Sequence, residues 1–231
     1  MTQLSESQHR LAKAAREIAN EKLHTLQKYK DARSEIERPD FLWHYLLQSF
    51  ATMGRSAGLE DLLGNPDHYK QLRYDVLAAL SPNDREAQVR RICRASRRLR
   101  MPDLKASYII GCFDQIEALG GLEAAKSLPL AERGYKAKIA FLKTFPGIGD
   151  KYSRNLLMDV YHEDFHDSIA IDTRIKAISD LLGLPRMTYD AHEAFYLAAA
   201  RSAGLNGWEL DRLMYNYRDE FLSRLAIAPS V

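Results

Sequence analysis

The sequence predicts an all-α protein, and three observations support this class. Apolar residues recur at three- and four-residue spacing in nearly every segment, as in the stripe between Phe41 and Phe50. Proline and glycine interrupt this pattern repeatedly, for example at Gly120-Gly121. Strand-like alternation is confined to Ile169-Ala170-Ile171, and three residues are too few to support a sheet. A set of helices joined by short turns is therefore expected.

The predicted helices can be followed from the N-terminus. Leu11, Ala15 and Ile18 lie on one face of an amphipathic helix, and residues 23–29 continue its pattern. The wider stripe over residues 41–50 predicts a more buried helix. Most of the later helices follow a break that contains proline or glycine. These later helices are predicted over residues 69–80, 85–99, 104–119, 122–126, 135–144, 150–161, 173–182, 191–203 and 207–225.

The 231 residues are enough for one large domain or for two small, closely packed ones, and 46% of them are hydrophobic. We expect a single unit over residues 1–231 with two helical subdomains, the central one inserted between chain ends that pack together. The sequence does not fix the boundary between them. No apolar run approaches the length that spans a bilayer. Cys93 and Cys112 are the only cysteines, so we expect no disulfide framework and no four-cysteine iron–sulfur cluster.

Positive charge is concentrated in one segment, although the formal net charge is only +2. Six arginines and no acidic residue lie between Arg90 and Arg100. If this segment is helical, several of the arginines share a face that suits the tracking of phosphates. A solvated helix face explains the same pattern, and the sequence leaves both interpretations open.

A glycine-containing turn stands between the predicted helices 135–144 and 150–161. It reads Pro146-Gly147-Ile148-Gly149, and its glycines allow positive φ and a close approach of backbone to a ligand. The N–H groups at the start of the next helix favour an anion, for which a DNA phosphate is the natural occupant. Ile148 is expected to pack back between the two helices. We interpret residues 136–162 as a helix-hairpin-helix motif; an ordinary helix–helix turn is the alternative.

Residues 142–153 and 169–175 together resemble the helix-hairpin-helix (HhH-GPD) superfamily of DNA glycosylases. The family hairpin runs L-P-G-V-G-x-K, and here Phe145 and Ile148 replace the leucine and the valine. The V-D-T-H segment of endonuclease III is matched by Ile171-Asp172-Thr173-Arg174. The lysine at the hairpin is typical of the bifunctional members, such as endonuclease III and the oxidised-guanine glycosylases. The loop at residues 161–168 makes the spacing slightly longer than in the family.

The resemblance implies roles for two residues. Lys151 would be the nucleophile that attacks the sugar C1′ atom and forms a Schiff base, which permits cleavage of the strand. Asp172 would stabilise the positive charge that develops on the deoxyribose. From its position alone, Asp172 also suits the N-cap of the helix that begins at Thr173. The implied activity is that of a base-excision glycosylase with abasic-site (AP) lyase activity, with oxidised guanine as the first substrate to test.

The resemblance has implications for partners and cofactors as well. The expected partner is double-stranded DNA with a damaged or modified base, bound by a monomer that contacts no membrane. Arg174 is expected to contact this DNA. The reaction requires no cofactor, and an iron–sulfur cluster is not expected, whereas an alkali-metal ion held by hairpin carbonyls is common in the family. A cytoplasmic, nucleoid-associated protein is expected, or a nuclear one in a eukaryote.

A damaged base must leave the helical stack before the sugar can be attacked, and a side chain usually fills the void. In the family this residue lies at the C-terminal end of an early helix, in an L-L-S-x-Q-like segment that residues 46–53 match loosely. Gln48 and Phe50 are the candidates. The residue types leave two other readings open, because Phe50 suits a core position and Gln48 a surface position.

Two other functions compete with this interpretation. His162-Glu163-Asp164-Phe165-His166 fits H-E-x-x-H, in which two histidines bind zinc and the glutamate acts as a general base. A zinc hydrolase would need this motif in the middle of a stable helix, together with a third ligand. The second alternative is a non-catalytic helix-hairpin-helix module that binds DNA; it leaves the pairing of Lys151 with Asp172 unexplained.

Overall fold

The computed structural model describes residues 5–226, apart from the side chains of residues 32 and 33. Within this range the regular elements are fifteen α-helices and two short 3₁₀ helices, and no residue lies in a strand. The predicted all-α class is therefore confirmed. None of the described helices combines the length and the apolar character that a membrane span requires.

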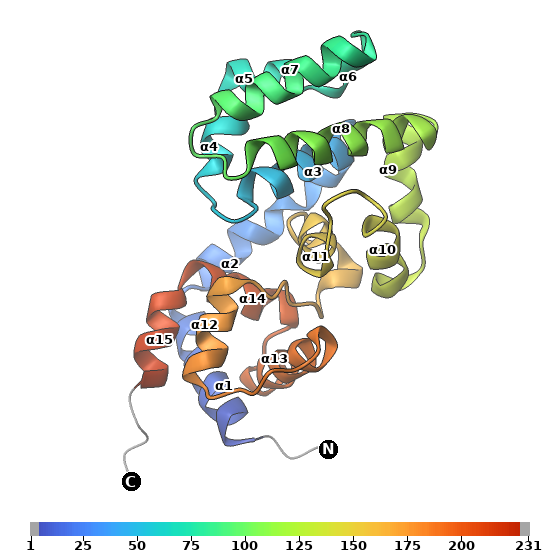
Figure 1. Ribbon diagram of the computed structural model, residues 1–231. Coiled ribbons are helices and arrows are strands. Elements are labelled where there is room, and N and C mark those ends of the chain that lie inside the picture. Colours follow the sequence, from blue (N-terminus) through green and yellow to red (C-terminus); the bar gives the residue numbers. More distant parts are fainter. Residues whose placement is uncertain (1–4, 227–231) are drawn as a thin grey trace. The chain divides into compact units, whose positions relative to one another are not determined.

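The chain divides into two compact units (Figure 1). The end unit contains Met1–Ser34 and Leu157–Val231, and the middle unit contains Glu35–Leu156. The central part of the chain is thus inserted between two terminal parts that belong to one unit. The division falls within the helix α11 (Asp150–Met158).

In the end unit, α1 provides the surface on which the C-terminal helices pack. It contacts α13, α14 and α15 (Figure 1). Its buried face consists of small and aliphatic side chains such as Leu11, Ala15 and Ile18. Ser5 caps the helix reciprocally with Gln8, so the sequence specifies where α1 begins. The helices of the end unit are α1 (Glu6–Glu21), α2 (Leu23–Lys30), α12 (Thr173–Leu181), α13 (Tyr189–Ala203), α14 (Gly207–Asn216) and α15 (Arg218–Ala226).

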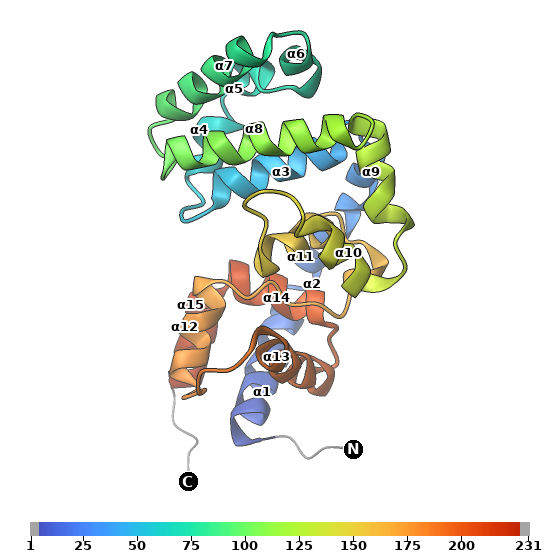
Figure 2. The same ribbon diagram turned by 45° about the vertical axis from the view of Figure 1, so that its right-hand side comes forward.

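In the middle unit, α8 lies between α7 and α3 (Figure 2). The helix α3 is apolar on nearly all sides because α4, α8 and α9 also pack against it. Trp43 of α3 meets Phe113 of α8 edge to face, with ring centroids 6.0 Å apart. The helices of this unit are α3 (Phe41–Thr52), α4 (Gly58–Leu62), α5 (Pro66–Gln71), α6 (Tyr74–Ala78), α7 (Pro82–Ala95), α8 (Pro102–Ala118), α9 (Leu122–Ala131), α10 (Gly134–Leu142) and most of α11.

Two predicted helices are each divided in the structure. The predicted helix over residues 69–80 is replaced by α5 and α6, because the carbonyl groups between them bond to side chains instead of to amides. Trp43 Nε1 donates to the carbonyl of Leu72 at 2.8 Å, and Gln88 donates to that of Gln71 at 2.8 Å. The predicted helix over residues 207–225 ends at Tyr217, where the backbone leaves the helical region, and α15 follows in a new direction.

Candidate functional site

The predicted glycine turn lies in the middle unit between α10 and α11. The N–H of Ile148 donates to the carbonyl of Phe145 at 3.1 Å, which closes a four-residue turn. Gly147 has a φ of +79°, and Pro146 precedes it, as in a type II turn. The helix α10 ends at Leu142 and α11 ends at Met158. The predicted motif over residues 136–162 therefore extends past α11 into an irregular segment.

The turn is held against α8. A Cβ atom on Gly147 would lie 2.5 Å from the ring of Tyr108, so only glycine permits this approach. Pro146 packs on Gly111, and its carbonyl accepts a weak hydrogen bond from Cys112 Sγ at 3.6 Å. Ile148 is buried, as expected for a residue that packs back into the helix pair. The position of the turn is therefore fixed by α8 as well as by its own helices.

Lys151 lies in the first turn of α11, where the N–H groups have no acceptor within the helix. Its side chain is half-buried, and Nζ lies 4.5 Å from the ring centroid of Tyr152. Close by, Lys143, the C-cap residue that follows α10, forms an ion pair with Asp150 at 2.7 Å. Arg154 is buried and donates to the carbonyl of Asp150 at 3.0 Å. The lysine and the helix terminus thus share the end of α11 that follows the turn.

Asp172 lies in the end unit at the N-cap of α12. Its Oδ1 atom accepts the N–H groups of Arg174 at 2.8 Å and of Ile175 at 3.0 Å. The side chain is half-buried. The predicted N-cap is therefore confirmed, and the cap holds the carboxylate in a defined orientation. Lys151 and Asp172 belong to different units.

An extended segment, residues 168–171, leads to Asp172. Its four side chains are buried, yet its amides bond to side chains instead of to a neighbouring strand. The N–H of Ile169 donates to Glu193 Oε1 at 2.9 Å, and that of Ala170 donates to Asp211 Oδ1 at 2.8 Å. Two buried carboxylates from α13 and α14 therefore replace the hydrogen-bond acceptors that a strand would supply.

The hydroxyl group of Tyr189 bonds the backbone of the two residues on either side of Ala170, just before Asp172. This hydroxyl accepts the N–H of Ile171 at 2.9 Å and donates to the carbonyl of Ile169 at 2.9 Å. One hydroxyl group thus acts as both donor and acceptor, as a residue of an adjacent strand would. Tyr189, Glu193 and Asp211 could not be predicted from the sequence, because each lies 18 or more residues away from its partner within an ordinary helical pattern.

Asp211 is buried, and burial raises the pKa of its carboxyl group to about 6. The guanidinium of Arg212 and the N–H of Ala170 act in the opposite direction, whereas the negative charges of Asp172 and Asp159 raise the pKa further. Arg212 itself forms an ion pair with Asp159 at 3.0 Å. Asp172 therefore lies near a carboxyl group that titrates close to neutral pH. An acidic residue between Leu210 and Leu213, both buried, is the one sequence signal that marks this position.

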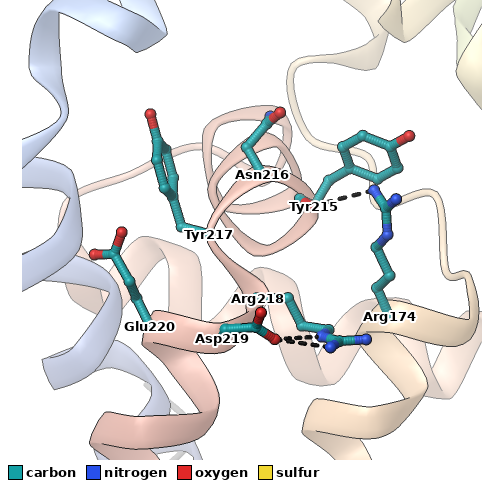
Figure 3. Close-up of a pocket in the computed structure, with 7 residues that line it drawn as sticks. All are labelled: Arg174, Tyr215, Asn216, Tyr217, Arg218, Asp219 and Glu220. Carbon is teal, nitrogen blue, oxygen red and sulfur yellow. Dashed lines mark hydrogen bonds and ion pairs between the residues drawn. The ribbon is translucent and has the colours of Figure 1, made fainter.

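Arg174 follows two residues after Asp172 and borders an open pocket of about 440 Å³ (Figure 3). Its guanidinium lies 4.0 Å from the ring centroid of Tyr215, and Nη1 donates to the carbonyl of Tyr215 at 3.4 Å. Arg218 on the same side pairs with Asp219 at 2.7 Å. The pocket is lined by Arg174, Tyr215, Asn216, Tyr217, Arg218, Asp219 and Glu220.

Phe50 occupies the core position that its residue type also suited, which argues against a role in filling a void in DNA. Phe50 is fully buried, and its ring packs against Tyr108 with centroids 5.7 Å apart. Gln48 is half-buried in α3 and stays a prediction. A different apolar side chain is exposed in the middle unit: Met101, 48% exposed, precedes α8 with a left-handed backbone (φ 52°). Non-glycine residues rarely adopt this conformation, least of all before a proline.

The H-E-x-x-H sequence does not form the helical site of a zinc hydrolase. Helix α11 ends at Met158, and Glu163–Phe165 form a 3₁₀ turn, so the two histidines do not lie one turn apart on an α-helix. His162 Nδ1 accepts the N–H of Asp164 at 3.1 Å, and His166 stacks on Tyr161 with centroids 4.1 Å apart. No group of three metal-ligating side chains occurs in the part of the chain that the structure describes.

The arginine segment forms many contacts within the protein. Arg90 pairs with Glu86 at 2.8 Å and Arg94 with Asp103 at 2.7 Å, while Arg98 pairs with Glu60. These carboxylates belong to α7, to the start of α8 and to α4. The continuous phosphate-tracking face that the sequence allowed is therefore partly neutralised by acids that lie elsewhere in the sequence.

The chain shares its fold with a solved DNA glycosylase structure. The solved structure that shows this is 8-oxoguanine DNA glycosylase from Methanocaldococcus jannaschii, with a TM-score of 0.66. The similarity covers 90% of this chain and 93% of that chain, at 17% sequence identity. No family model matches the chain, and no curated protein matches it in sequence. The fold predicted from two short motifs is thus confirmed.

Proposed function

We propose that this protein is a base-excision DNA glycosylase with AP lyase activity. One observation carries the proposal: Lys151 occupies the first turn of α11, directly after the glycine turn, in a fold shared with a DNA glycosylase. The half-buried amine and the capped carboxylate of Asp172 supply the two groups that such a reaction requires.

The proposed reaction uses these two side chains in sequence. The neutral amine of Lys151 bonds to C1′ of the damaged nucleotide as the C1′–N bond breaks, and the base leaves with the electron pair and gains a proton. Asp172 stabilises the positive charge on the sugar during this step. Loss of a proton from the nitrogen and opening of the sugar ring give a Schiff base. Removal of a C2′ proton then expels the 3′ phosphate and cleaves the strand.

Binding to DNA is proposed to use the backbone more than side chains. The turn formed by Pro146, Gly147, Ile148 and Gly149 precedes the N-terminus of α11, where N–H groups and the helix dipole favour a phosphate. Ile148 is buried, so it would contribute through its position in the turn and not through side-chain contact. Arg174, beside an open pocket, would contact a second phosphate.

Oxidised guanine is the proposed first substrate, because the similar solved structure is that of an 8-oxoguanine DNA glycosylase. Oxidised pyrimidines and bulkier modified bases follow in that order. Extrusion of the base leaves a void, for which Gln48 and the exposed Met101 are the candidate side chains. The proposed chemistry needs no bound metal, so we expect excision to persist in excess EDTA.

Borohydride trapping tests the lyase proposal. Wild-type protein is mixed with a duplex that contains one abasic site, and the Schiff base is reduced to a stable covalent complex. We expect Lys151→Gln to abolish trapping. Lys143→Gln is the matched control, because Lys143 is an exposed lysine beside the same turn. Trapping that persists in Lys151→Gln would reject the assigned nucleophile.

A second variant tests the role of Asp172. Asp172→Asn retains a good N-cap residue, so α12 is expected to remain intact. We expect excision to slow strongly while the affinity for duplex DNA is retained. If the wild type binds duplex DNA but neither traps nor excises any damaged base, the protein is a non-catalytic DNA-binding module instead.

A further inference from the structure

The segment that leads to Asp172 is held by side chains from other helices. Residues 168–171 are extended and buried, and among the described residues no strand lies beside them. A buried amide without an acceptor is costly, so the side chains that accept these amides determine where the segment lies. Those acceptors are Glu193, Asp211 and Tyr189.

The segment is also closely confined by α14. A Cβ atom on Gly207 would lie 2.8 Å from the backbone nitrogen of Ser168, so glycine is needed where α14 begins. The N–H of Trp208 donates to the carbonyl of His166 at 2.8 Å, which joins the start of α14 to the chain just before the segment. Backbone contacts with α14 therefore fix the N-terminal end of the segment.

At the other end, side chains bond the backbone of the segment. Tyr189 bonds both Ile169 and Ile171, and Asp211 bonds the intervening Ala170. Asp172 follows directly, with Oδ1 fixed by the first amides of α12. The carboxylate thus follows directly on the backbone that Tyr189 and Asp211 bond. A displacement of about 1 Å at a reacting group can reduce a rate by about 100-fold.

We propose that Tyr189 and Asp211 are positioning residues for Asp172, holding its carboxylate where positive charge develops on the sugar. This inference rests on the proposed function. Tyr189 fixes the backbone immediately before Asp172, and Asp211 fixes the middle of the segment while adding a nearby charge. The charged groups around Asp211 are Arg212 on its own helix, Asp159 after α11 and Asp172 at the start of α12.

The test compares two tyrosine hydroxyl groups on α13. Tyr189→Phe removes the contacts with the segment. Tyr196→Phe is the matched control, because its hydroxyl donates to the carbonyl of Ile175 at 3.1 Å and also bonds Ser179 on α12, away from the segment. Single-turnover excision, duplex affinity and melting temperature are measured for both variants and the wild type.

We expect Tyr189→Phe to reduce the single-turnover rate at least about tenfold while duplex affinity stays within about twofold. Tyr196→Phe should leave the rate near that of the wild type, whatever its melting temperature. An unchanged rate in Tyr189→Phe would overturn the inference. Equal losses of rate in the two variants would also overturn it, because they would indicate a general effect on folding.

Asp211→Asn supplies a readout that a purely structural role would not change. The amide oxygen of asparagine can still accept the N–H of Ala170, whereas the nearby charge is removed. We expect the pH profile of excision to lose an inflection that the wild type shows; identical profiles would remove Asp211 from the inference. A wild type without any excision would overturn the proposed function and this inference together. An active wild type unaffected by both changes would overturn the inference alone.

Discussion

Gly147 and Tyr108 are in contact across the turn, with no room between them for a side chain. A Cβ atom on Gly147 would lie 2.5 Å from Tyr108 Cδ2, on a backbone with a φ of +79°. Gly149 differs on both counts, because its φ lies outside the left-handed region and a Cβ atom there would meet nothing within 4 Å. Two glycines in one short turn are therefore constrained to very different degrees.

We expect Gly147→Ala to lower the free energy of unfolding by about 2 kcal/mol or more, from backbone strain and from displacement of the Tyr108 ring. Gly149→Ala should change it by less than about 1 kcal/mol. Urea unfolding of both variants checks this prediction. Equal destabilisation would show that the contact between the turn and α8 contributes little.

A second prediction concerns stability and pH. The pKa of Asp211 is raised to about 6 by burial, so the folded state binds this proton more tightly than the unfolded chain does. The stabilisation from the bound proton is complete below about pH 4 and is lost as the pH rises through 6. Relative to Asp211→Asn, the wild type should therefore lose up to about 3 kcal/mol between pH 4 and pH 7. Parallel curves of unfolding free energy against pH would contradict this.

Arg174 should contribute to affinity through charge. We expect Arg174→Ala to weaken binding to every duplex sequence similarly and to reduce the slope of log K against log salt by about one. The control is Arg201→Ala, which removes an exposed arginine from α13 in the same unit. Fluorescence anisotropy over a range of salt concentrations measures both. An unchanged slope in Arg174→Ala would indicate that its stacking on Tyr215 is purely structural.

Met101 should affect the rate of excision only when the damaged base lies in duplex DNA. Met101 lies about 10 Å from Tyr108 along the axis of α8. Tyr108 contacts the glycine turn, and about 10 Å corresponds to roughly three base steps along a DNA strand. We expect Met101→Ala to slow excision from a duplex by about tenfold and to leave excision from the same strand unpaired unchanged. Leu128→Ala is the control, because Leu128 is 39% exposed in the same unit. Equal effects on both substrates would argue against a wedge.

Much of the fold could be predicted from the sequence because helices have a local signature. The apolar period and the proline and glycine breaks located most helices, and the residue types predicted the glycine turn and the N-cap at Asp172. The division between α5 and α6 was not predictable, since it depends on Trp43 and Gln88, which lie far away in the sequence. The same limit applies to the burial of Phe50, which depends on its packing against Tyr108 of another helix.

The hydrogen-bond partners of the extended segment show this limit most clearly. Glu193 and Asp211 occupy positions at which a helical pattern allows either a surface acid or a buried one. Only the approach of residues 168–171 distinguishes these cases. Polar residues with partners remote in sequence leave no periodic signal, whereas apolar residues do.

The inserted arrangement of the chain has a consequence for its synthesis. Arg224 of α15 pairs with Glu17 of α1, although 207 residues separate them. At the usual rate of translation, α15 is synthesised roughly 10 to 40 s after α1. Until α13, α14 and α15 have been made, the apolar face with Leu11 and Ile18 lacks the C-terminal helices that pack on it. The helix α1 therefore stays incompletely packed until α15 has been made.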